Sequence, residues 1–125
     1  MAITVAEMLA AARAVVPAVT PAETQALIDQ GALVIDIRDS AEIAASGKIK
    51  GAIAVGRGLL EFKADPTAPS HDPQFRQDRP VVVYCASGGR AALAGKTLKD
   101  MGYTSVHNLG GYKSWADSGG AVDKS

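Results

Sequence analysis

The sequence predicts an α/β fold in which a parallel sheet is covered by helices on both faces. Three short apolar runs are typical of strands buried inside such a sheet, at residues 32–37, 52–55 and 81–84. Segments with the helical spacing of apolar residues alternate with these runs along the chain. Because the alternation continues without internal repeats, it favours parallel strands joined by helical crossovers.

Length and composition indicate one domain without an excess of charge. The chain has 125 residues, 47% of them hydrophobic, which is enough for a single core. Lys and Arg number 13 and Asp and Glu number 13, so no net charge favours nucleic acid or an acidic membrane surface. No stretch has the length of a membrane span, and the first residues lack the basic lead-in of a signal peptide. We therefore expect a cytoplasmic protein that binds neither nucleic acid nor membrane.

The first two helices are marked by their caps. Thr4 can cap a helix over residues 5–16, which the next proline ends. Residues 18–19 can form a short edge strand. Residues 20–23 read Thr-Pro-Ala-Glu, a capping box with proline at the first helical position. This box predicts a second helix over residues 21–30.

The strand at residues 32–37 brings two charged residues, Asp36 and Arg38, to its carboxyl end. A short helix is predicted to follow, on which Glu42 lies four residues after Arg38, a spacing that allows an ion pair. Residues 56–79 contain several prolines and only a weak helical pattern, so we expect an ordered but irregular excursion over the surface.

Cys85 begins a loop between the strand at 81–84 and a predicted helix. In an open α/β sheet, such a loop lies at the carboxyl edge of the strands, where ligands bind. The free N–H groups and the positive dipole end of the helix favour an anion, and a thiolate is an anion. Gly88 and Gly89 allow successive N–H groups to curl inward, and Arg90 adds a positive charge. The pattern predicts a nucleophilic sulfur in a cationic cradle.

A lone cysteine at a strand end is more often a small buried hydrophobe than a nucleophile. The Gly-Gly-Arg run after Cys85 favours the nucleophile, because a core cysteine has no use for such a loop. One cysteine also excludes an internal disulfide, a zinc site built from several thiolates, and a resolving thiol within the chain. Any group that Cys85 takes up must therefore leave to another molecule.

The last third of the chain is predicted to contain one strand and two helices. The helix after the loop covers residues 91–101, and the strand covers 105–109. Gly110 and Gly111 then turn the chain into a helix over residues 112–117, beyond which the chain should fray. We expect both histidines of the sequence to be structural, because neither lies beside a residue that would make it a catalytic base.

Four motifs occur in order over about residues 18–118. They read Asp36-Ile37-Arg38 with Glu42, Gly47-Lys48-Ile49-Lys50-Gly51-Ala52, Tyr84-Cys85-Ala86-Ser87-Gly88-Gly89-Arg90, and Asn108-Leu109-Gly110-Gly111-Tyr112-Lys113-Ser114-Trp115. Together they resemble the rhodanese family of sulfurtransferases, in its single-domain form. Four ordered matches around a loop typical of an active site make this resemblance specific.

The resemblance implies a rhodanese-like fold with five mainly parallel strands and helices on both faces. It implies that Cys85 carries sulfur as a persulfide, and that Asp36 and Arg38 buttress the active-site loop or line its pocket. The loop that would hold an anionic donor consists of Ala86, Ser87, Gly88, Gly89 and Arg90. Two positions depart from the family pattern: Lys48 stands where a histidine is common, and Gly89 stands where a larger residue is common.

We accordingly divide the chain into three parts. Residues 1–17 form an N-terminal helical extension, residues 18–118 form the rhodanese-like domain, and residues 119–125 form a flexible C-terminal tail.

The resemblance also implies a reaction that needs no cofactor and no metal. Sulfane sulfur would pass from a small anion such as thiosulfate, through Cys85, to cyanide, a thiol or a partner protein. Two alternatives remain: a rhodanese-like module that binds a partner without catalysis, and a cysteine-based phosphatase or arsenate reductase. The latter enzymes place five residues between cysteine and arginine, whereas four separate Cys85 from Arg90. The shorter loop favours sulfur transfer.

Overall fold

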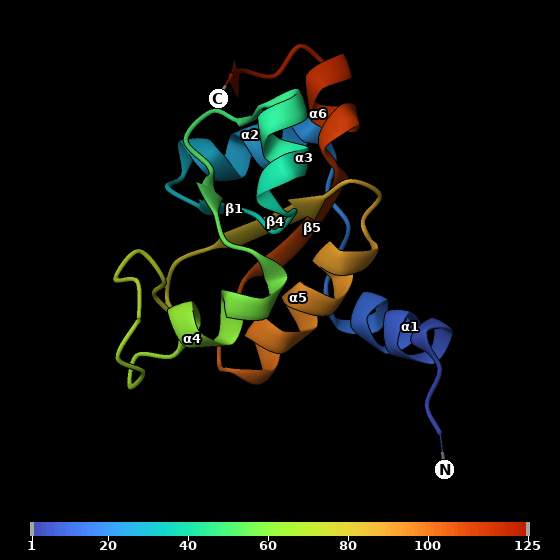
Figure 1. Ribbon diagram of the computed structural model, residues 1–125, viewed down its shortest axis with the longest axis vertical. Helices are drawn as coiled ribbons and strands as arrows, with labels where there is room; N and C mark the ends of the chain where they lie inside the picture. The colour runs from blue at the N-terminus through green and yellow to red at the C-terminus, as the bar shows by residue number, and fades with distance from the viewer. Residues whose placement is uncertain (1, 125) are drawn as a thin grey trace.

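The computed structural model describes residues 2–124 and contains a four-stranded sheet with the order β3-β1-β4-β5 (Figure 1). The strands are β1 (Leu33–Asp36), β3 (Ile53–Ala54), β4 (Val81–Cys85) and β5 (Val106–Gly111). All three pairings between neighbours are parallel. Every residue of the central strands β1 and β4 is buried, as their contiguous apolar runs predict. The predicted α/β fold with a parallel sheet is confirmed.

The expected fifth strand of this sheet is reduced to a single bridge. Ala18 pairs in parallel with Asn108 at the outer edge of β5. The Asn108 N–H donates to the Pro17 carbonyl, and the Val19 N–H donates to the Asn108 carbonyl, both at 2.9 Å. The pairing stops there because Pro17 has no N–H to donate and Thr20 already caps the next helix. The sheet therefore has four strands where we expected five.

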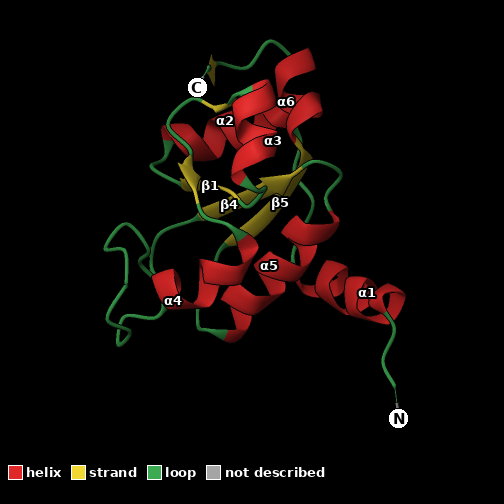
Figure 2. Ribbon diagram, in the orientation of Figure 1, coloured by secondary structure: helices red, strands yellow, loops and turns green. Residues whose placement is uncertain are grey.

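Six α-helices cover the two faces of the sheet (Figure 2). Three of them, α1, α4 and α5, lie on one side of the sheet in Figure 1, and α2, α3 and α6 lie on the other. Their bounds are α1 (Val5–Val15), α2 (Pro21–Asp29), α3 (Ser40–Ser46), α4 (Leu60–Ala64), α5 (Gly89–Asp100) and α6 (Tyr112–Asp117). The first three begin with complete capping boxes formed by Thr4, Thr20 and Asp39.

Alternate residues of β4 enter two separate cores. Val81, Val83 and Cys85 pack in the core that faces α5, whereas Val82 and Tyr84 pack in the core that faces α6. Successive side chains of a strand point to opposite faces, so the consecutive residues Tyr84 and Cys85 serve different sides of the sheet. This alternation decides which of the predicted site residues can meet.

Helix α1 packs directly against α5. Ala12 and Val16, at its carboxyl end, are buried. A Cβ atom on Gly95 would lie 2.9 Å from Val16 Cγ1, so the two helices approach this closely only because residue 95 is glycine. The division of residues 1–17 from the domain stays a prediction, but the described part of this segment shares the core of the domain.

The C-terminal segment forms part of a second, two-stranded sheet. Strand β6 (Val122–Asp123) pairs antiparallel with β2 (Lys48–Ile49). The Trp115 indole N–H donates to the Ala121 carbonyl at 2.9 Å, which holds the chain end over α6. We expected the chain beyond residue 117 to fray. Instead β6 and β2 satisfy each other's backbone groups, a long-range pairing that local glycines do not reveal. Residue 125 of the expected flexible tail lies outside the described residues, and the division of this tail from the domain stays a prediction.

The excursion over residues 56–79 is irregular, as predicted, apart from a 3₁₀ turn at Arg57–Leu59 and α4. Phe75 is buried and meets the Tyr103 ring edge-on, with ring centroids 6.3 Å apart. The Tyr103 hydroxyl donates to the Ala64 carbonyl at 2.7 Å. These contacts tie both ends of the excursion to the core, so a segment rich in proline is nonetheless ordered.

Candidate active site

Cys85 is the last residue of β4, at the carboxyl edge of the sheet. Its side chain belongs to the core that faces α5, and the residue is fully buried. The Gly88 N–H donates a hydrogen bond to Cys85 Sγ, with 3.0 Å between nitrogen and sulfur. This bond places a backbone N–H at the sulfur, where the chain enters α5. Gly88 thus supplies one N–H donor to the sulfur, and the cationic cradle around Cys85 stays a prediction.

Gly88 turns the chain into α5. Its φ of +99° lies in the left-handed region, which glycine adopts without strain. Helix α5 starts at Gly89, two residues earlier than predicted, because this single residue makes the turn. A Cβ atom on Gly88 would lie 3.3 Å from Gly110 Cα, so the loop also rests closely on the turn after β5.

Arg90 pairs with Glu42 of α3. Its Nη1 and Nη2 atoms lie 2.7 and 2.9 Å from Glu42 Oε1 and Oε2, a bidentate ion pair. This bond lowers the pKa of Glu42 to about 2, and it also raises the pKa of Arg90. The Arg90 and Glu42 side chains are 41% and 32% exposed. We expected Glu42 to pair with Arg38, and this expectation is wrong.

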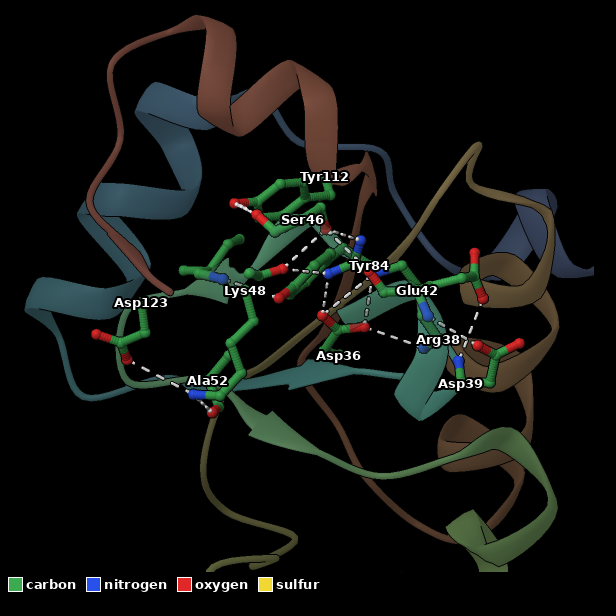
Figure 3. Close-up of polar contacts among 12 residues, drawn as sticks. Asp36, Arg38, Asp39, Glu42, Ser46, Lys48, Ala52, Tyr84, Tyr112 and Asp123 are labelled. Atoms are coloured by element: carbon green, nitrogen blue, oxygen red, sulfur yellow. Dashed lines mark hydrogen bonds and ion pairs between the residues drawn. The ribbon is translucent and has the colours of Figure 1, made fainter. Parts of the chain in front are cut away.

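Arg38 instead pairs with Asp36 in the interior (Figure 3). Its Nη2 lies 2.7 Å from Asp36 Oδ2, and its Nε lies 3.0 Å from Oδ1. The remaining guanidinium donors bind Ser46 Oγ and the Gly47 carbonyl, each at 2.8 Å. Its Cζ lies 4.5 Å from the centroid of the Tyr112 ring. Burial disfavours the charge of Arg38, but the bonds to Asp36 outweigh burial and raise its pKa.

Asp36 and Arg38 thus serve the face of the sheet opposite Cys85. Their partners are α3 and Tyr112, and in the described residues no hydrogen bond joins either side chain to the loop at 85–90. Strand alternation explains this: Asp36 lies beside Tyr84 in the ladder, and Tyr84 points away from Cys85. Their predicted role at the loop stays a prediction, with no direct contact to support it.

Two residues that contact the loop were not predicted as site residues. Glu42 holds Arg90, and Asn108 donates from Nδ2 to the Gly88 carbonyl at 3.3 Å. Asn108 is buried among apolar neighbours and directly precedes the Leu-Gly-Gly turn. A buried amide beside a glycine turn is the signal that marks such a residue, since a buried polar group needs partners.

Neither histidine supplies a base to Cys85. His71 contacts the Phe75 carbonyl through Nε2 at 3.2 Å, within the excursion. His107 contacts Ser105 Oγ through Nε2 at 2.9 Å, and burial lowers its pKa. Lys48 donates to the Ala52 carbonyl at 2.9 Å, far along the chain from the loop. The donor that the described residues direct at Cys85 Sγ is therefore the Gly88 N–H, and neither histidine contacts the sulfur.

Residues 2–124, the described part of the chain, contain neither a cluster of metal ligands nor a membrane-spanning helix. No three His, Cys, Asp or Glu side chains of this part of the chain come together as a metal site. None of its helices has the length and apolar character needed to cross a bilayer.

A protein-family model for the rhodanese-like domain matches residues 20–118. The chain belongs to the rhodanese-like domain family. It is 38% identical over 98 residues to a sulfurtransferase of Allochromatium vinosum, covering 77% of this chain and 83% of the relative. It is 36% identical over 101 residues to the thiosulfate sulfurtransferase GlpE of Pseudomonas fluorescens, covering 78% and 82%. The sulfurtransferases among its relatives are thus matched over most of their length.

A solved structure from Rhodopseudomonas palustris is also similar to this rhodanese-like domain. That protein is of unknown function and a possible tyrosine phosphatase. It is 39% identical, with a TM-score of 0.88, and the match covers 98% of this chain and 96% of the other. The likeness therefore includes α1, which lies before the residues that the family model matches.

Proposed function

We propose that this rhodanese-like protein is a thiosulfate sulfurtransferase in which Cys85 carries the transferred sulfur as a persulfide. The observation that carries the proposal is the hydrogen bond from the Gly88 N–H to Cys85 Sγ. This bond lies at the start of α5, whose first turn contains Arg90. The relationship to sulfurtransferases over most of the chain supports the same chemistry.

The reaction is balanced by two displacements at sulfur. The Cys85 thiolate attacks the outer sulfur of thiosulfate, a new S–S bond forms, and sulfite leaves with the electron pair of the broken S–S bond. An acceptor such as cyanide then attacks the outer sulfur of the persulfide, thiocyanate forms, and the electron pair returns to Cys85. No proton moves in either step, which fits a site without a neighbouring histidine.

Stabilisation of anions is the main demand of this chemistry. Thiosulfate, sulfite, the thiolate and the persulfide are all anions. The Gly88 N–H donates a hydrogen bond to the sulfur. Arg90 lies in the first turn of α5, and 41% of its side chain is exposed. An anionic sulfur donor can therefore reach the Arg90 guanidinium from solvent. In this structure, the N–H groups of that guanidinium bind Glu42.

The acceptor is a molecule outside this chain, because Cys85 is the only cysteine. Cyanide, a small thiol and a partner protein all meet this requirement. Leu59 and Phe62, in the excursion, each expose more than half of their surface, and they belong to the surface at which we expect a protein acceptor to dock.

The test is the intact mass of the purified protein after thiosulfate and again after cyanide. Wild-type protein is expected to gain one sulfur atom and to lose it to cyanide with formation of thiocyanate. Cys85→Ser is expected to gain none while its unfolding midpoint stays close to that of the wild type. Sulfur uptake by the Cys85→Ser variant would overturn the proposal.

The same samples distinguish the two alternatives. Hydrolysis of an aryl phosphate, lost in Cys85→Ser and without sulfur uptake, would indicate a phosphatase. A wild-type protein that takes up no sulfur from thiosulfate or polysulfide and hydrolyses no phosphate would indicate a binding module. The four-residue spacing from Cys85 to Arg90 supports the sulfur-transfer outcome.

A further inference from the structure

Strand β5 has one extra residue where it passes the end of β4. Val83 pairs with Asn108 and Tyr84 pairs with Gly110, so Leu109 is an insertion in the ladder, a β-bulge. A bulge leaves a backbone group without its ladder partner. Here the Gly110 N–H donates to Asn108 Oδ1 at 2.8 Å, so the side chain of Asn108 takes the place of a strand partner.

The other end of the Asn108 amide reaches the active-site loop. Its Nδ2 donates to the Gly88 carbonyl at 3.3 Å, and Asn108 is only 9% exposed. The same carbonyl accepts the first hydrogen bond of α5, from the Ala92 N–H at 2.9 Å. Two donors from different elements therefore hold the Gly88 carbonyl.

Asn108 is itself held firmly from the sheet edge. Its backbone N–H and carbonyl bond to Pro17 and Val19, and its Cα lies in the ladder opposite Val83. Because both ends of its side chain are also bonded, the amide has one orientation that satisfies every polar atom. Asn108 is thus a fixed point against which the loop can be placed.

The orientation of Gly88 determines where its N–H points. Gly88 has φ +99° and ψ −14°, and without a side chain it has no steric reason to stay in this region of dihedral space. The two hydrogen bonds to its carbonyl are among the contacts that can hold it there. When they do, its N–H lies 3.0 Å from Cys85 Sγ.

We propose that Asn108 is a positioning residue for sulfur transfer, which holds Gly88 so that the N–H of Gly88 stays on the sulfur of Cys85. The inference rests on the proposed function, in which Cys85 is the nucleophile. The role differs from that of sealing the bulge, which needs only the Oδ1 atom and the Gly110 N–H.

The substitution Asn108→Asp separates the two roles. Aspartate keeps the size of the side chain and the oxygen that accepts from Gly110, but it places an oxygen instead of a donor against the Gly88 carbonyl. Ser105→Ala is the matched control, because Ser105 Oγ bonds to His107 near the same strand and, among the described residues, its side chain makes no hydrogen bond to the loop. Unfolding midpoints establish that each variant is folded.

Two measurements report on the loop without requiring sulfur transfer. The first is the NMR signal of the Gly88 amide proton, which is expected to move upfield in Asn108→Asp as its bond to sulfur lengthens. The second is the rate of alkylation of Cys85 by iodoacetamide at neutral pH, which is expected to fall about tenfold, the size of one lost bond to a charged group. Sulfur uptake from thiosulfate is expected to fall to a similar extent. Ser105→Ala is expected to match the wild type in all three.

A folded Asn108→Asp variant with the wild-type Gly88 signal and alkylation rate would overturn the inference. A measurement on the wild type covers the case in which the variant does not fold. Asn108 is the only asparagine, so protein labelled with ¹⁵N-asparagine gives one side-chain amide pair. That pair is expected to shift when Cys85 is alkylated, and a pair that does not move would also overturn the inference.

The outcomes separate this inference from the proposed function. If the wild type takes up no sulfur but Asn108→Asp still changes the Gly88 signal and alkylation, the proposed function fails and the positioning role stands. If the wild type transfers sulfur and Asn108→Asp transfers it equally well, the positioning role fails and the proposed function stands.

Discussion

Two arginines lie at the carboxyl edge of the sheet, and their charges have different surroundings. Arg38 follows β1, has a side chain 4% exposed, and gives its donors to Asp36, Ser46 and Gly47. Arg90 begins α5, has a side chain 41% exposed, and is bonded to Glu42. The first arginine belongs to the core that faces α6, and the second stands beside Cys85.

The comparison shows that two charges at the same edge of the sheet can have very different surroundings. Removing one partner of a buried pair leaves the other charged and without water, so we expect the Asp36–Arg38 pair to stabilise the fold. The partners of a half-exposed pair are both hydrated when they separate, so the Glu42–Arg90 pair can open for an anionic donor. Four predictions test this contrast, beginning with the largest effect.

Arg38→Met is expected to lower the free energy of unfolding by about 3–5 kcal/mol, because it leaves Asp36 buried without its partner. Urea unfolding followed by circular dichroism measures the change. The matched control is Arg76→Met, at the exposed Arg76–Asp78 pair, where a change below about 0.5 kcal/mol is expected. Equal effects of the two substitutions would contradict a structural role for the buried pair.

Arg90→Met is expected to slow sulfur uptake from thiosulfate about 100-fold, the effect of removing one group that stabilises an anion in the transition state. The free energy of unfolding is expected to change by less than about 1 kcal/mol, because the Glu42 pair is half exposed. Single-turnover sulfur uptake followed by intact mass measures the rate, and urea unfolding measures the free energy of unfolding. Normal uptake would show that Arg90 does not act on the donor.

Glu42→Gln is expected to raise the rate of thiosulfate uptake about threefold at low salt, because one negative charge leaves the surroundings of Arg90. Glutamine still completes the capping box with Asp39, so α3 is expected to remain intact. The gain should disappear at high ionic strength, where exposed charges are screened. A slower rate would instead mean that Glu42 is needed to orient Arg90.

The smallest expected effect is on the free energy of unfolding at acidic pH. The bond to Arg90 lowers the pKa of Glu42 from its usual value of 4.5 to about 2. A carboxyl with a lowered pKa in the folded state adds stability above its usual value, and this stability is lost as the pH falls through the lowered value. The free energy of unfolding of the wild type is therefore expected to exceed that of Glu42→Gln by a few tenths of a kcal/mol above about pH 5. This difference is expected to vanish as the pH falls through about 2. Urea unfolding across this range measures it, and a difference that persists near pH 2 would contradict the assignment.

Much of the fold could be predicted because its signals are local. The apolar runs of β1 and β4 are buried strands whatever surrounds them, since only a covered sheet accepts such runs. Thr4 and Thr20 begin helices because a capping box involves residues only three positions apart. The loop after Cys85 could be recognised for the same reason, as its glycines and arginine are contiguous.

The partners of the charged residues could not be predicted in this way. Arg90 and Glu42 are 48 positions apart, and Asn108 and Gly88 are 20 positions apart. The pairing of β6 with β2, which replaced the expected fraying tail, is likewise long-range. Each depends on which faces meet after the sheet has assembled.

The sequence by itself determined the buried central strands, the order of the helices and the place of Cys85 at the start of a helix, because each of these follows from neighbours along the chain. Only the tertiary structure decided that Asp36 and Arg38 turn away from Cys85 while Glu42 and Asn108 reach its loop. The physical reason is that side chains alternate across a strand, so residues at the same sheet edge are separated by the sheet itself.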